Sequence, residues 1–166
     1  MRKQLYLDIQ DKLKAIKDDS GMQLLQHFDL WNQQVNFIEA ESPFNFPAVF
    51  VEFMPHQWQT LGNKVQQAEI VIRLHIVTKW FAQTAEYSPL QSEALDYLDL
   101  PDKLFAAMQS NATSASNGFM RLSSTVNHNH EGIVDTIEEY KTLIVDQSAV
   151  TSQTPLTNTT PVINIP

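Results

Sequence analysis

Alternation of apolar and polar positions is the clearest pattern in the chain, and it covers residues 66–80. The even positions from 68 to 76 are apolar, namely Ala68, Ile70, Ile72, Leu74 and Ile76, whereas most odd positions of the stretch are polar. A period of two over this length predicts a long strand with one buried face. A strand with one polar face is typical of antiparallel sheets. We therefore expect His75, at an odd position, on the exposed face.

A helical period marks two other segments. Leu5, Ile9, Leu13 and Ile16 recur at spacings of four, four and three, which predicts an N-terminal helix over residues 3–17. A central helix is predicted to begin with Ser88 as its N-cap, before Pro89. Pro101 interrupts the apolar stripe that follows, because it lacks an N–H and clashes with the carbonyl of Tyr97. We expect a helix to about Tyr97, a kink, and a second piece to Met108.

The remaining strands are predicted from β-branched and aromatic runs bounded by turn residues. Residues 48–54 form one strand after a proline-containing loop, and residues 22–38 form one broken strand or two short ones. Residues 118–127 and 133–146 form a long hairpin, while residues 56–64 form a loop with a turn at Gly62-Asn63. A bulge near Glu138-Glu139 would bring the apolar residues of the last strand onto one face.

These elements predict an α+β fold. We expect an antiparallel or mixed sheet of about four to five strands, with the N-terminal helix and the kinked central helix packed on one face. Residues 1–146 form a single domain that ends in the long hairpin. Residues 147–166 form an extended C-terminal arm, because the segment has no charged side chain, three prolines, and an apolar end at residues 161–166.

Composition and net charge exclude several classes of function. The chain has 166 residues and a formal net charge of −8, and its pI of about 4.9 makes it a poor general binder of phosphate backbones. Charged residues are only 18%, and amides and hydroxyls take their place, which suits a protein that works packed against others. The absence of Cys excludes disulfides and thiolate metal sites. We expect no signal peptide and no membrane span.

Candidate chemistry is sparse. His128, His130 and Glu131 form the one cluster of ligand-like residues, but an ordinary polar turn explains the same pattern, and no third ligand is evident elsewhere. With four glycines spread over the chain, no phosphate-binding loop is present. We expect neither a catalytic site nor a cofactor. The candidate interface residues are the aromatic anchors and the apolar end of the arm: Trp58, Trp80, Val162, Ile163 and Ile165.

The order of elements and several local patterns resemble the tail terminator, or tail-completion, proteins of long-tailed bacteriophages and prophages. The resemblance spans residues 4–146. It is carried by LYLDIQDKLKAI, FPAVFVEF, AEIVIRLHIVTKW, ALDYLDLPDKLFAAM and RLSSTVNHNHEGIVDTIEEYKTLIVD, in this order along the chain. The family has no catalytic motif, so no site residue is carried over.

The resemblance implies a structural virion protein that is made in the cytoplasm of a bacterial host. Such a protein forms a ring at the head–tail neck, typically of six copies, which caps the tail tube and ends its polymerisation. Its partners are the tail tube protein and a head-completion or connector protein, and DNA passes through the ring without specific binding. An acidic lumen would repel phosphates.

Two other functions stay open. One is another ring of the neck or tail, such as a head-completion, stopper or baseplate-related component. The other is a small metal-dependent enzyme that uses His128, His130 and Glu131.

Overall fold

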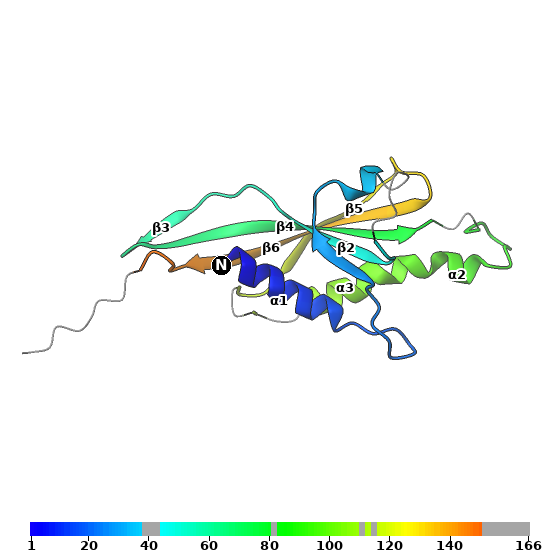
Figure 1. Cartoon of the computed structure of the whole chain (residues 1–166), viewed down its shortest axis with the longest axis horizontal. Coiled ribbons are helices and arrows are strands. Elements are labelled where there is room, and N and C mark those ends of the chain that lie inside the picture. The colour runs from blue at the N-terminus through cyan, green and yellow to red at the C-terminus, as the bar shows by residue number, and fades with distance from the viewer. Residues whose placement is uncertain (38–43, 81–82, 110–111, 114–115, 151–166) are drawn as a thin grey trace, which may run out of the picture.

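A six-stranded mixed sheet forms the centre of the molecule (Figure 1). The computed structural model describes residues 1–37, 44–80, 83–109, 112–113 and 116–150. The strands are β1 (His27–Leu30), β2 (Ala48–Phe53), β3 (Gln59–Gly62), β4 (Val65–Lys79), β5 (Met120–Asn127) and β6 (Ile133–Asp146). Their order across the sheet is β1-β2-β4-β6-β5, and β3 pairs with the start of β4. Among the strand pairs in the described residues, only β1–β2 is parallel.

The predicted long strand is confirmed as β4. It pairs with β6 without interruption from Gln66 opposite Asp146 to Lys79 opposite Ile133. On its other edge, β4 pairs first with β3 and then with β2. Because β4 and β6 are the two longest strands and lie side by side, they set the long axis of the molecule (Figure 1).

The predicted bulge at Glu138-Glu139 is wrong. The β4–β6 register is continuous there, and the irregularity lies in the partner strand, between Arg121 and Ser123 of β5. Residues of β6 therefore alternate strictly between the two faces. Tyr140 lies on the face that the helices cover, and Ile133 lies on the opposite face.

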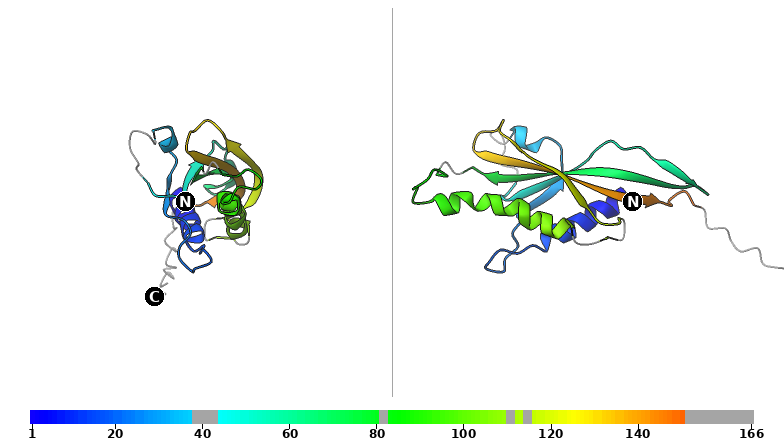
Figure 2. Two further views of the ribbon diagram at one scale, coloured as in Figure 1. Left: turned by 90° about the vertical axis from the view of Figure 1, so that its right-hand side faces the viewer. Right: turned by 180° about the vertical axis from the view of Figure 1, so that it is seen from behind.

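Helices α1 (Arg2–Lys14) and α3 (Asp99–Gln109) cover one face of the sheet, which we call the helical face (Figure 2). This arrangement confirms the predicted fold class. The main core lies between these helices and the sheet, where every member is shielded from water. The largest contributors are Leu5, Ile9 and Leu13 from α1, Leu104 and Met108 from α3, and Ile70, Ile72, Leu74, Ile76 and Tyr140 from the sheet.

The first helix is shorter than predicted and ends at Lys14. Asp18 replaces the last turn with a local turn, because its Oδ1 accepts hydrogen bonds from the backbone N–H groups of Ser20 and Met22, both at 2.9 Å. The chain reverses there and pairs Lys17 with Gln23.

The predicted break in the central helix is confirmed. A 3-10 turn, Asp96–Leu98, separates α2 (Gln91–Leu95) from α3. Pro101 lies in the first turn of α3, where its missing N–H costs no helical hydrogen bond. The predicted N-cap at Ser88 is wrong, since α2 begins at Gln91 with Leu90 at the cap position.

The opposite face of the sheet, which we call the outer face, is covered at one end. A second apolar cluster of Val35, Ala48, Phe50, Val77 and Ile133 lies there, with Trp31, Phe44 and Phe46 packed against it. In the region predicted as one or two strands, the first part is β1, but the second is a 3-10 turn at Gln34–Phe37. This turn helps to cover the sheet face that alternation had predicted to be exposed.

Strand β3 was not predicted, although the turn after it was. Gly62, Asn63 and Lys64 all have positive φ, at 99°, 49° and 62°. They reverse the chain so that Gln59 lies opposite Gln67.

The start of the predicted arm is a turn in which the N–H of Val150 donates to the carbonyl of Gln147 at 2.9 Å. Residues 151–166 lie outside the described part of the chain, so the division into one domain and an arm stays a prediction. Within the described ranges, no helix has the length and apolar character needed to cross a membrane.

Candidate functional site

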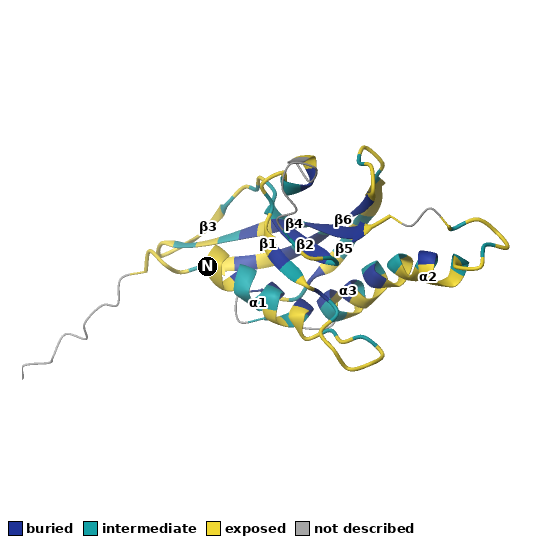
Figure 3. Ribbon diagram, turned by 45° about the vertical axis from the view of Figure 1, so that its right-hand side comes forward, coloured by how far each residue is buried: buried dark blue, intermediate teal, exposed yellow. Residues whose placement is uncertain are grey.

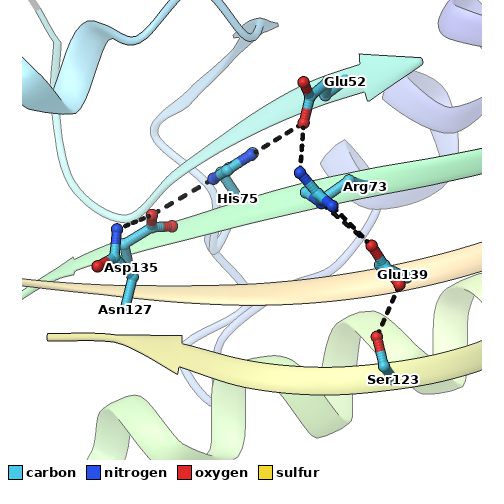
Figure 4. Close-up of polar contacts among 7 residues, drawn as sticks. All are labelled: Glu52, Arg73, His75, Ser123, Asn127, Asp135 and Glu139. Carbon is cyan, nitrogen blue, oxygen red and sulfur yellow. Dashed lines mark hydrogen bonds and ion pairs between the residues drawn. The ribbon is translucent and has the colours of Figure 1, made fainter. Parts of the chain in front are cut away.

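A row of polar side chains crosses the outer face over four neighbouring strands (Figure 4). Strand pairing explains the row, because it sets Glu52 opposite Arg73 and Arg73 opposite Glu139. We call these residues the outer-face polar row. Its members are Glu52, Arg73, His75, Ser123, Asn127, Asp135 and Glu139.

Arg73 joins three strands within this row. Its Nη1 lies 3.1 Å from Oε2 of Glu52 on β2, and its Nη2 lies 2.8 Å from Oε1 of Glu139 on β6. Ser123 on β5 donates its hydroxyl to the other oxygen of Glu139 at 3.0 Å. The hydrogen bond from Arg73, followed by the one from Ser123, holds the pKa of Glu139 below its ordinary value. The same pairing raises the pKa of Arg73.

His75 is buried, contrary to the exposed position that alternation predicted. Its side chain lies under Trp31, whose ring stacks on the imidazole with 3.6 Å between centroids and 1° between planes. The Nδ1 atom lies 3.3 Å from Oδ2 of Asp135, and Nε2 lies 3.5 Å from Oε2 of Glu52. Asn127 also donates to Oδ2 of Asp135, at 3.4 Å. Each ring nitrogen therefore faces a carboxylate from a different strand.

A histidine oriented by a buried aspartate is also found in hydrolytic triads. Here the second nitrogen faces Glu52 rather than a hydroxyl nucleophile, and Trp31 covers the ring. In the described part of the chain, no serine or threonine hydroxyl is hydrogen-bonded to His75. The arrangement ties β2, β4, β6 and β5 together.

A second charged cluster lies on the helical face. The carboxylate of Glu138 is fully buried and accepts hydrogen bonds from Nη1 of Arg121, at 3.1 Å, and from the hydroxyl of Tyr140. The guanidinium of Arg121 lies over the ring of Phe105, with 3.8 Å to its centroid. Burial, and then the bond to Glu138, raises the pKa of Tyr140. In this cluster the carboxylate is fully buried, whereas the side chain of Arg121 is partly exposed.

The predicted metal candidates lie in the turn between β5 and β6. His128 and Glu131 are exposed, while His130 is half-buried, with Nε2 at 3.2 Å from Nδ2 of Asn127. No group of three or more His, Asp or Glu residues is placed to share a metal ion in the described residues. The turn interpretation accounts for all contacts seen at this position.

The predicted interface residues have different environments. Trp80 is 45% exposed and meets Tyr97 edge-on, with 6.2 Å between ring centroids. Trp58 is half-buried against the main core, edge-on to His56. Val162, Ile163 and Ile165 lie outside the described residues.

Two groups of exposed apolar residues were not predicted from the sequence. Figure 3 shows that exposed residues predominate at the end of the sheet where β3 lies. One lies on the edge strand β5 and comprises Leu122 and Val126. The other lies on the part of the sheet formed by residues 59–71 and 142–146, which we call the tongue, and comprises Leu61, Leu143 and Val145, with the exposed Met120 of β5 beside Leu143. Leu122 and Val126, which interrupt a mostly polar strand, were a signal for the first group. Exposed apolar residues gathered on particular elements mark interaction surfaces.

A cavity of about 490 Å³ adjoins the first group, between β5 and the start of α3. A larger one, about 980 Å³, lies between the α2 region and the end of β4. Its lining includes Asp18, Glu93, Asp96 and Lys79 among aromatic side chains. No catalytic arrangement is evident among the described residues of either lining.

No protein-family model and no curated protein sequence matches this chain. Among solved structures, a chain from the virion of a native gene transfer agent particle is similar in fold, with a TM-score of 0.50. The match covers 87% of this chain and 97% of that chain, at 10% sequence identity. At this identity the similarity shows the fold alone: this chain has a fold that also occurs in the virion of a gene transfer agent particle.

Proposed function

We propose that this chain is a structural protein of a phage-like virion. It forms a ring at the head–tail junction that caps the tail tube, ends its polymerisation and joins the tail to the head connector. The similar virion-particle chain supports this assignment, because the match spans nearly the whole of both chains. The charged side chains of both polar clusters contact one another across neighbouring strands, which agrees with a structural role.

The observation that carries the proposal is the pair of exposed apolar surfaces on β5 and on the tongue. They lie on different parts of the molecule (Figure 1). Two different contact surfaces per copy are what a head-to-tail contact requires, and such contacts close into rings when the rotation allows. The surface that meets the preceding copy therefore differs from the one that meets the next.

The acidic character of the chain fits the passage of DNA. Each copy contributes a formal net charge of −8, so a ring of several copies is strongly negative. Like charge keeps a phosphate backbone from binding to the wall of the ring. DNA would then move through the lumen without being held.

Native mass measurement of the purified protein, together with mass spectrometry of purified virions, tests the proposal. We expect a discrete homo-oligomer and the presence of the chain in virions. Loss of the protein from a producing strain is expected to give tail tubes of uncontrolled length, because nothing caps them. A strictly monomeric protein that is absent from particles contradicts the proposal.

A position elsewhere in the neck or tail is the second candidate, since the shared fold does not distinguish one virion ring from another. Gold-labelled antibody on intact particles separates the positions. Label at the head–tail junction, together with overlong tubes in the deletion strain, supports the terminator. Label at the distal end supports a baseplate-related component.

A further inference from the structure

We infer that residues 162–165 of one copy add a strand to the free edge of β5 in a neighbouring copy. The inference rests on the proposed ring and specifies one of its contacts. It assigns an occupant to the exposed edge of the sheet and to the cavity beside that edge.

The β5 edge is open along part of its length. Among the described strands, β5 pairs with β6 alone, so its other edge presents unpaired N–H and C=O groups. Natural edge strands are usually blunted by lysine, proline, inward-pointing charge or bulges. The first part of β5 has two of these features, namely Arg121, which Glu138 and Phe105 hold, and the irregularity between Arg121 and Ser123. From Ser123 to Asn127 the strand has none of them, so this stretch is suited to pairing with another strand.

The cavity beside this edge has an apolar part that can receive apolar side chains. It measures about 490 Å³, and Leu98, Pro101, Leu122 and Val126 form this apolar part. The rest of the lining is polar and comprises Asp102, Arg121, Ser123, Ser124, Thr136 and Glu138. The charge of Glu138 is already matched by Arg121 at 3.1 Å. An incoming apolar chain therefore leaves no buried charge without a partner.

The sequence of the C-terminal segment matches these requirements. Residues 147–166 have no charged side chain, and Pro161 and Pro166 enclose the four residues Val-Ile-Asn-Ile. In an extended strand, Ile163 and Ile165 share one face, so both can point toward the cavity. Because proline has no N–H, the two prolines limit the added strand to its four central residues and stop further edge-to-edge growth.

The neighbouring copy is the partner that the sheet geometry favours. The chain leaves the sheet at Asp146, on the tongue, whereas β5 pairs with the stretch of β6 from Asp135 to Lys141. An arm that served its own β5 would have to turn back along the sheet. Residues 151–161 span up to about 36 Å when extended, which is enough to cross a contact between copies.

Disulfide mapping tests this contact. Because the sequence has no Cys, every disulfide must form between the introduced residues. Two differently tagged chains are co-expressed, one with Ile163→Cys and one with Leu122→Cys. The matched control replaces Leu122→Cys with Leu30→Cys. Leu30 lies on the opposite edge strand, β1, and is 49% exposed, against 48% for Leu122. Neither substitution removes a buried side chain, so both proteins are expected to fold.

We expect the Ile163→Cys and Leu122→Cys chains to form a disulfide-linked dimer that carries both tags. Its yield should be at least about tenfold higher than that of the control pair, because a disulfide requires Cα atoms within about 7 Å. A chain that carries both Ile163→Cys and Leu122→Cys shows whether the link forms within one chain.

An oligomer with no enrichment over the control, or with links inside single chains, overturns the inference and leaves the ring intact. Absence of any oligomer, with the chain absent from virions, overturns the proposed function and the inference together. The two failures are therefore distinguishable.

Discussion

At the residue scale, two arginines form ion pairs that link neighbouring strands. Arg73 contacts carboxylates on both neighbouring strands, and Arg121 compensates a carboxylate that is fully buried. Both guanidinium groups are partly open to solvent, with side-chain exposures of 28% and 31%. Their contributions to stability therefore differ mainly through the burial of the carboxylates they hold.

Arg73→Gln should lower the free energy of unfolding by about 1–2 kcal/mol at pH 7, because two facing carboxylates lose their shared cation. Glu139 has a lowered pKa in the folded protein, so its contribution is complete above the ordinary value of 4.5 and is lost as the pH falls through the folded value. The difference between wild type and variant should therefore shrink below about pH 4.5. Urea unfolding at several pH values measures it. A difference that is constant from pH 7 to pH 3 would contradict the assigned pairing.

Arg121→Met should cost more, about 3 kcal/mol, because it leaves the buried carboxylate of Glu138 without its cation. The double variant Arg121→Met/Glu138→Met should recover much of this loss, since no charge then remains buried. Tyr140→Phe is the matched control, as it removes one hydrogen bond and keeps the ion pair. Thermal and urea unfolding of the four proteins provide the measurement, and equal stability of the single and double variants would contradict the role given to Arg121.

At the element scale, local patterns predicted most of the secondary structure. The alternation over β4, the break before α3 and the final hairpin all depend on residues close in sequence, and the structure confirms them. Strand β3 was missed because it has four residues and pairs only with the start of β4. The register between strands could not be predicted from local sequence either. The predicted bulge was in β6, whereas the irregularity lies in β5.

The outer-face polar row shows why a site is harder to predict than a strand. Glu52, Arg73 and Glu139 are far apart in sequence and come together only when the strand order and register are known. The burial of His75 depends on Trp31, which belongs to a different segment and crosses over the sheet. Alternation alone assigns a side chain to a face and does not show what covers that face.

The exposed apolar residues of the tongue should contribute to contacts between copies. The double variant Leu143→Ser/Val145→Ser should lower the free energy of unfolding by only about 1–2 kcal/mol and leave the protein folded, because the two residues are 37% and 40% exposed and bury only part of their apolar surface. The same variant should raise the dissociation constant of the homo-oligomer at least about tenfold, since exposed apolar residues at a contact provide much of its binding energy. Met22→Ser, in the turn after α1, removes a side chain that is 66% exposed and serves as the control. Analytical ultracentrifugation over a range of concentrations distinguishes the two variants, and equal dissociation constants would contradict a contact at the tongue.

At the scale of the whole molecule, the proposed passage of DNA leads to a prediction that depends on net charge. With a formal net charge of −8, the assembled protein should give no mobility shift of duplex DNA at 150 mM salt. Lowering the salt should strengthen repulsion rather than binding. A gel-shift series across salt concentrations checks this. Binding that weakens steeply with added salt would instead identify a basic surface in the assembly and would contradict a repelling lumen.

The position of β6 has a consequence for synthesis. It is the last of the described strands to leave the ribosome, yet it lies inside the sheet, between β4 and β5. The central pairing joins residues that are up to 80 positions apart, from Gln66 to Asp146, so the sheet closes late and from distant parts of the chain. A polypeptide that terminates early lacks this inner strand and leaves β4 and β5 without a common partner. Incomplete products should then be cleared by proteolysis as unfolded chains instead of competing with full-length copies during assembly.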